Sequence, residues 1–404
     1  MSRSVDNPWL HRFAVLTALA TLALIAVGGL VTSHGVGMAV PDWPTTYGYN
    51  MFFFPFSQWV GGVFYEHSHR LIASLVGMLT AILAGWIWSR ETCGWPRRLG
   101  LCAIVATLGL MGVRTQGMFL VLAVVAFGVI VFSVMKLRHD QRSLRWLAAI
   151  AFSAVLIQGV LGGLRVTAMK GEIGIFHGTL AQLFFSLVCL IALLTSRRWQ
   201  QAGETLRSLS ISTGLRRMLL FTTLLILGQL VLGATMRHQH AGLAVPDFPL
   251  AYGKVWPPTD TQSLSAINQH RVDTREFKPI TAAQIYLHMT HRLTAMAVLA
   301  AVATCAWRSR RELGATAPLA RWTGAWLGLI CTQALLGAWT VWSNKAADIA
   351  TLHVVIGSLS LMAGALLTTA AFRRSSCSVG SETRIVSPSA KENLVPAGRP
   401  VRTV

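Results

Sequence analysis

The segment Glu66-His67-Ser68-His69-Arg70 stands at the head of an apolar run that continues to about Trp88. On an α-helix, Glu66, His69 and Arg70 occupy positions i, i+3 and i+4 and therefore share one face. Ionisable side chains are costly to bury at the end of a membrane span, so such a cluster indicates a functional site. We predict a membrane helix here, with that site in its first turns.

A second copy of this segment is Leu287-His288-Met289-Thr290-His291-Arg292, which heads the apolar run that ends near Trp307. When Arg292 is aligned with Arg70, His291 falls on His69 and His288 falls on Glu66. The recurrence of one ionisable pattern indicates that the chain is duplicated.

The composition predicts a membrane protein. Only 12% of the 404 residues are charged, about half the share that is usual in soluble proteins, and the mean hydropathy is +0.54. The net charge of +20 lies in loops and in the tail, which fits positive-inside topology and gives no reason to expect a nucleic-acid partner. Runs of roughly 20 apolar residues, enough to cross a bilayer, occur at 12–32, 66–88, 145–167, 175–195, 215–236, 285–307, 318–341 and 350–371, and weaker runs at 98–113 and 117–135.

The basic residues set the orientation of these spans. With the N-terminus in the cytoplasm, the short inside loops are rich in Lys and Arg, whereas the first outside loop, residues 33–58, contains neither. The loop 237–284 does carry basic residues, but long loops cross the membrane largely regardless of charge. Both termini are therefore predicted to be cytoplasmic. No cysteine falls in an outside loop, so no external disulfide is expected; the six are Cys93, Cys102, Cys189, Cys305, Cys331 and Cys377.

The two halves of the chain share further motifs. GMAVPDWP at 37–44 is matched by GLAVPDFP at 242–249, and QGVLGG at 158–163 by QALLGA at 333–338. Tyr47-Gly48 likewise corresponds to Tyr252-Gly253. Four spans followed by four equivalent spans predict an all-α polytopic membrane protein with two tandem four-helix bundles.

The repeat exposes an insertion in the first half. The offset between copies is 222 residues at the His-Arg segments but 175 at the Gln-Gly segments, so about 47 extra residues lie near 91–137. An even number of crossings preserves the downstream orientation, so we predict a two-helix hairpin, and a surface-lying or re-entrant pair is the alternative. The predicted parts are a cytoplasmic N-terminus at 1–11, repeats at 12–200 and 201–372, and a disordered cytoplasmic tail at 373–404.

Four histidines lie at the outer ends of the second and fourth main helices of each half: His69, His177, His291 and His353. Each half therefore offers two imidazoles across a four-helix bundle, a natural place for a haem or a metal. Two imidazoles suit the axial positions of haem iron, whereas zinc needs a third or fourth close ligand. The alternative is that each is a hydrogen-bonded histidine at the membrane interface.

Other histidines are expected to have different roles. His67 points away from His69 around the helix, so it is not expected to share a ligand with it. His288 is either a catalytic partner or a packing residue of the second site. The histidines of the outside loops are expected in solvent: His34, His238, His240 and His270.

The halves differ one turn before the first histidine of each pair, where Glu66 is replaced by His288. Glu66 can serve as a base or stabilise positive charge on a substrate; alternatively, it only orients a neighbouring His or Arg. Arg70 and Arg292 suit haem propionates, because guanidinium pairs bidentately with carboxylate; alternatively, they snorkel to the interface. This asymmetry favours one catalytic site and one electron-storage site.

Taken jointly, the Glu-x-x-His-Arg helix, the Pro-Asp-Trp-Pro loop, the Gln-Gly-x-Leu-Gly-Gly helix and the four histidines resemble the haem A synthase family. The resemblance runs from residue 10 to 372, apart from the insertion. It implies an eight-helix core in a bacterial inner membrane that oxidises the C8 methyl group of haem O to a formyl group. Many bacterial members have a cysteine pair in the first outside loop, which this sequence lacks.

The resemblance also implies roles for particular residues. Glu66, His69 and His177 would belong to a substrate-haem site in the N-terminal half, and His291 and His353 to a haem b cofactor site in the C-terminal half. A haem O synthase and cytochrome oxidase assembly factors would be partners, and a homo-oligomer is compatible with the sequence.

Three functions are therefore considered. The first is an oxidoreductase that hydroxylates a haem methyl group successively. The second is a di-haem b-type membrane cytochrome that exchanges electrons with quinone. The third is a transporter, although transporters usually place their polar groups near the midplane, and here these groups cluster at the outer ends. Glu66 favours the enzyme, because electron transfer alone needs no carboxylate in only one half.

Overall fold

A computed structural model describes residues 7–111, 116–140, 143–201, 211–270 and 279–373. Within these ranges the chain is helical, and its only β-type pairings are two isolated bridges, Thr46 with Tyr49 and Ala251 with Lys254. Residues up to Arg373 form one compact unit. The predicted disordered tail, 373–404, lies outside the described residues except for Arg373 itself.

Eight long helices correspond to the eight predicted spans. Each predicted span lies inside one helix, apart from residue 195, which follows the last residue of its helix. The helices are α1 (Pro8–Ser33), α2 (Gly61–Glu91), α5 (Leu144–Thr167), α6 (Ile173–Leu194), α9 (Thr213–His238), α11 (Ala282–Leu313), α12 (Pro318–Trp342) and α13 (Ala347–Phe372). Shorter elements are η1 (Met51–Phe53), η2 (Phe56–Gln58), α7 (Arg197–Gln201) and α10 (Thr261–Gln269).

The described residues include nine helices that are long and apolar enough to cross a membrane: the eight above and most of α4 (Gln116–His139). This confirms the prediction of an all-α polytopic membrane protein. The remaining long helix is α3 (Gly94–Met111). It carries Arg97 and Arg98 near its N-terminus, and these two residues lower its mean hydropathy.

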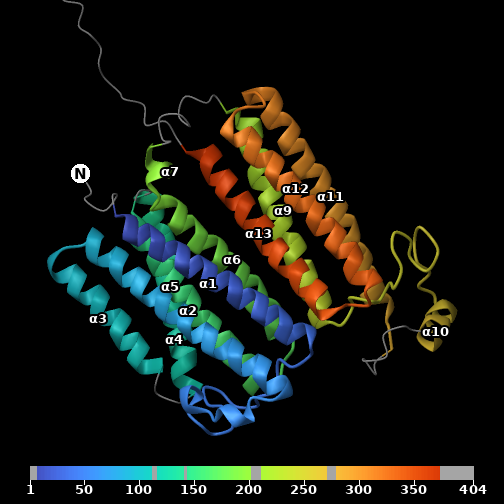
Figure 1. Ribbon diagram of the computed structural model, residues 1–404, viewed down its shortest axis with the longest axis horizontal. Coiled ribbons are helices and arrows are strands. Elements are labelled where there is room, and N and C mark those ends of the chain that lie inside the picture. Colours follow the sequence, from blue (N-terminus) through green and yellow to red (C-terminus); the bar gives the residue numbers. More distant parts are fainter. Residues whose placement is uncertain (1–6, 112–115, 141–142, 202–210, 271–278, 374–404) are drawn as a thin grey trace, which may run out of the picture. The chain divides into compact units, whose positions relative to one another are not determined.

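The helices pack as two sets of four (Figure 1). In the first set, α1 contacts α2 and α6, and α5 contacts the same two helices, which closes a ring. In the second set, α9, α11, α12 and α13 contact one another in the same way. We call these sets the first and second bundles. They meet where α13 packs on α1 and α6 and where α6 packs on α9.

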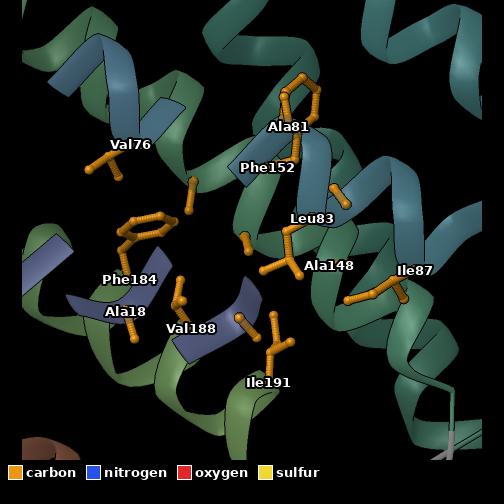
Figure 2. Packing of buried hydrophobic residues seen from close by; sticks show 14 of the residues in the cluster. Ala18, Val76, Ala81, Leu83, Ile87, Ala148, Phe152, Phe184, Val188 and Ile191 are labelled. Atoms are coloured by element: carbon orange, nitrogen blue, oxygen red, sulfur yellow. The ribbon is translucent and has the colours of Figure 1, made fainter. Parts of the chain in front are cut away.

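Buried apolar side chains pack together between the helices of the first bundle (Figure 2). Leu83 of α2, Phe152 of α5 and Val188 of α6 belong to one cluster with Ala18 of α1. In a bilayer such packing stabilises helix association through close van der Waals contact, because lipid tails remove the hydrophobic driving force between helices. The cluster does not extend to the other ends of these helices, where the histidines and other polar groups lie.

The insertion near 91–137 forms two helices, α3 and α4, as predicted. They lie beside the first bundle (Figure 1), with α4 packed on α5 and α3 packed on α2. Phe119 of α4 also contacts Trp43 of the loop between α1 and α2, with ring centroids 4.4 Å apart. The insertion therefore supports that loop as well as the bundle wall.

Candidate functional site

His69 and His177 face each other inside the first bundle. His69 lies in the third turn of α2 and His177 in the second turn of α6, and their ring centroids are 6.5 Å apart at an interplanar angle of 75°. Both Nδ1 atoms are buried, and neither has a hydrogen-bond partner within the described part of the chain. A buried polar atom without a partner needs an explanation, and a ligand bound between the two rings would supply one.

His291 of α11 and His353 of α13 form the corresponding pair in the second bundle. Their imidazoles are close enough to interact electrostatically, and their Nδ1 atoms are also buried without a partner among the described residues. Gln333 of α12 contacts His353, with 3.3 Å between the two Nε2 atoms. Gln229 of α9 donates to the backbone carbonyl of His291 at 2.9 Å.

Each of these four imidazoles lies against a glycine of a neighbouring helix. A Cβ atom placed on Gly28 would be 3.0 Å from Cε1 of His69, and one on Gly233 would be 3.2 Å from Cε1 of His291. The two remaining pairs are Gly162 with His177, at 3.4 Å, and Gly337 with His353, at 3.2 Å. The Gln-Gly motifs contained Gly162 and Gly337, but only the packing of the helices shows that all four glycines make room for the rings.

Glu66 and Arg70 fasten the loop between α1 and α2 to α2. Glu66 Oε1 accepts from Arg70 Nη2 at 2.8 Å, and Glu66 Oε2 accepts from the backbone N–H of Val40 at 2.9 Å. Arg70 also donates to three loop carbonyls, those of Val40, Asp42 and Thr45, at 2.7–3.0 Å. Both side chains are buried. The loop backbone therefore uses much of the donor capacity of Arg70.

The loop between α9 and α11 is fastened in the same way, but without a carboxylate. Arg292 donates to the carbonyls of Val245, Asp247 and Leu250 at 2.6–3.2 Å, and it packs over the ring of Phe248. His288 takes the place of Glu66 and is also buried.

The two loops adopt the same turn. Asp42 accepts from the N–H groups of Tyr47 and Gly48 at 2.7 and 2.9 Å, and Asp247 does the same for Tyr252 and Gly253 at the same distances. Both residues of each pair have positive φ, which only glycine adopts without strain. Partial burial raises the pKa of Asp42, but its hydrogen bonds from Gly48, Thr45 and Tyr47 outweigh that effect, so the pKa lies below 3.8.

His67 has its own partners. Its Nδ1 atom is 3.1 Å from the hydroxyl of Thr46, and its ring contacts those of Phe54 and Trp59. It is fully buried in these contacts, as a residue that supports the loop.

Three basic residues that sequence reasoning did not assign to a site lie near the histidine pairs: Arg165 of α5, and Arg237 and His238 of α9. Arg165 is close enough to His69 and His177 to interact electrostatically with both. His238 was expected in solvent, and this expectation is wrong, because α9 extends to include it and its ring lies against Gly174 of α6. His34, His240 and His270 are exposed, as expected.

The histidine pairs fit a haem better than a bare metal ion. No group of three or more His, Cys, Asp or Glu side chains among the described residues could hold a metal, so the chain offers two ligands per site. A haem supplies its own equatorial ligands and needs two axial ones. An imidazole–metal–imidazole stack with bonds of about 2 Å places ring centroids roughly 6 Å apart, close to the observed 6.5 Å for His69 and His177.

The glycine contacts allow a test of this fit. Gly233→Val should push the His291 ring aside, because even its Cβ would be only 3.2 Å from Cε1. Overpacking of this kind costs about 1–3 kcal/mol, or roughly tenfold to a hundredfold in haem affinity. Gly228→Val is the matched control on α9, since a Cβ there has no atom within 4 Å. Haem content of the purified variants decides, and equal content in both would contradict the expected contact.

Comparison with known proteins identifies a family and several relatives. The sequence model of a family described as cytochrome oxidase assembly protein matches residues 114–365. Proteins named haem A synthase are similar to the chain: that of Shouchella clausii is 26% identical over 265 residues, which cover 65% of this chain and 70% of the relative. That of Novosphingobium aromaticivorans is 25% identical over 400 residues, 90% of this chain and 95% of the relative. That of Anaplasma marginale is 32% identical over 233 residues, 52% of this chain and 58% of the relative.

Proposed function

The chain belongs to the haem A synthase family of cytochrome oxidase assembly proteins, and on that premise we propose that it oxidises the C8 methyl group of haem O to a formyl group, giving haem A. The observation that carries this proposal is the presence of two imidazole pairs with buried, unpartnered Nδ1 atoms at equivalent positions, only one of which has a carboxylate one turn away. The alternative of a di-haem electron-transfer cytochrome is not favoured, because the similar proteins are named for an enzyme.

We assign the first bundle to the substrate. His69 and His177 would hold haem O, and the cluster of apolar side chains below them keeps water out (Figure 2). Two hydroxylations of the methyl group give a geminal diol, which loses water to become the aldehyde. With water as the source of oxygen, each hydroxylation breaks one C–H bond, forms one C–O bond, passes two electrons to an external electron acceptor and releases two protons, and we assign Glu66 to accept one of these protons. Arg70 supports the site by holding Glu66 and the loop in position.

We assign the second bundle to a haem b cofactor held by His291 and His353. When bound, haem b supplies the one-electron redox chemistry that side chains lack. At the position equivalent to Glu66, the second site has His288 and therefore lacks the negative charge of a carboxylate. Arg292 fixes the loop that closes the second site.

The function is tested by producing the chain together with a haem O synthase in a bacterial host that makes no haem A. Haems extracted from the membranes are then separated by chromatography. We expect haem A when the chain is present and only haem O when it is absent or carries His69→Ala. Absence of haem A in the presence of haem O and of the folded, haem-containing protein would contradict the proposal.

We further propose that the protein lies in a bacterial inner membrane with both termini in the cytoplasm and with both histidine pairs near the outer face. The Lys and Arg distribution supports this orientation, and a haem O synthase and oxidase assembly factors in the same membrane would be its partners. Tyr47 and Arg217 are exposed, so single cysteines introduced there can be labelled with an impermeant thiol reagent. A cysteine at position 47 should be labelled only from the outside, and one at position 217 only from the inside. Labelling of position 47 from the cytoplasm would overturn the orientation.

A further inference from the structure

Arg165 lies near the first histidine pair and forms no salt bridge within the described part of the chain. It lies in the last turn of α5, and its guanidinium lies against Gly37 of the outside loop, where a Cβ would be 2.7 Å from Nη2. Its buried Nε has no hydrogen-bond partner among the described residues.

Arg237 is a second such cation and comes from the other bundle. It is the penultimate residue of α9, and its Nη2 reaches α1 of the first bundle, where it donates to Gly29 O at 2.6 Å and to Ser33 Oγ at 2.5 Å. Arg237 interacts electrostatically with both Arg165 and His353. The two arginines therefore lie near each other where the bundles meet, each close to a histidine pair.

The described protein residues offer little negative charge to this pair. The carboxylate close enough to act on Arg165 is that of Glu66, and it already pairs with Arg70 at 2.8 Å. Two like charges in a partly buried place repel each other and lose hydration, and both costs fall when an anion binds between or beside them. The pair is thus suited to carboxylates supplied by a ligand.

The arginines that sequence reasoning assigned to haem propionates are engaged elsewhere. Arg70 gives four hydrogen bonds to Glu66 and to loop carbonyls, and Arg292 gives three to loop carbonyls. The guanidinium N–H groups of Arg165, in contrast, remain available to a ligand. A guanidinium can bind a carboxylate bidentately.

We propose that Arg165 binds a propionate of the haem in the first bundle and that Arg237 binds a propionate of the haem in the second, which anchors both haems at the junction between the bundles. This inference rests on the proposed function, because the ligand is the haem pair assigned there. It adds an asymmetry: the position of α12 equivalent to Arg165 is Thr340, so the cation for the second haem comes from α9 instead.

The test uses protohaem and its dimethyl ester, which has the same ring but no propionate charge, as probes for reconstitution of the haem-depleted full-length protein. A hydrogen-bonded charge is worth about 1.5–3 kcal/mol, so each site of the wild type should prefer the free acid by roughly tenfold to a hundredfold. Arg165→Gln should lose most of that preference at the site in the first bundle, and Arg237→Gln at the site in the second bundle. The double variant should lose it at both sites.

Two controls remove the same charge at the opposite ends of the same helices, Arg145→Gln on α5 and Arg217→Gln on α9. They should keep the wild-type preference for the free acid. The midpoint potential gives a second readout, because loss of a neighbouring cation favours ferric iron. A tenfold shift of the reduction equilibrium, 59 mV for one electron, is expected in the Arg165 and Arg237 variants and not in the controls.

The outcomes separate this inference from the proposed function. If the wild type binds no haem through the four histidines, the proposed function fails and this inference fails with it. If haem binds with unchanged axial ligation, but both arginine variants keep the preference for the free acid and the wild-type potential, the inference alone is overturned.

Discussion

His353→Ala is expected to abolish stable binding of haem in the second bundle, and His291→Ala should do the same. In the proposed assignment each pair would hold the iron through two imidazoles, and the described residues around the second pair offer no third His, Cys, Asp or Glu in ligand position. Loss of one axial bond leaves an open position and a cavity of ring size. Reduced-minus-oxidised spectra of the purified variants should therefore show loss of most haem b.

Gln333→Leu is a useful comparison, because it removes the side chain that contacts His353 but keeps both ligands. It should retain haem with a changed potential or spectrum, since side chains that contact an axial ligand tune the metal rather than hold it. Full retention of haem b in both histidine variants would refute the assignment of this site, even if activity were lost.

The helices and the depth of the histidines could be predicted from sequence because both depend on local patterns. Apolar runs of about 20 residues define spans, and the repeat placed His69, His177, His291 and His353 at the same end of their helices. The structure confirms the helices and brings His69 close to His177. The roles of these histidines, and the limits of the two repeats, stay predictions.

The tertiary partners of the arginines could not be predicted. Arg70 and Arg292 were given to propionates because of their charge and position, whereas their contacts with carbonyls of residues 40–45 and 245–250 depend on how each loop folds back. Arg165 and Arg237 do not recur in the other repeat, so the comparison of halves passed over them. His238 was misplaced because its apolar run ends before its helix does.

Glu66→Gln is expected to stop the conversion of haem O while leaving haem bound. His69 and His177 stay in place in this variant, so the substrate haem should still be ligated. An amide, however, can neither accept a proton nor offset developing positive charge. Loss of a general base costs roughly 10²–10⁴-fold in rate. Extracted haems should contain haem O, with the alcohol intermediate, and little haem A.

The structure also supplies the competing explanation. Both oxygens of Glu66 accept from donors, Arg70 Nη2 and the N–H of Val40, so an amide at position 66 must turn its NH₂ group toward one of them. An unmet buried donor costs about 1–3 kcal/mol, and the loop would loosen. If this is the only role of Glu66, haem content and conversion should fall together.

Arg70→Gln separates the two roles, because it also loosens the loop, by removing the hydrogen bonds to the carbonyls of Asp42 and Val40, but keeps the carboxylate of Glu66. If Glu66 takes part in the chemistry, conversion per bound haem should fall much further in Glu66→Gln than in Arg70→Gln. If Glu66 only fastens the loop, the two variants should lose conversion in proportion to the haem they lose. Near-normal haem A with glutamine at position 66 would remove Glu66 from the reaction and leave it as the residue that holds Arg70 and Val40 beside the substrate site.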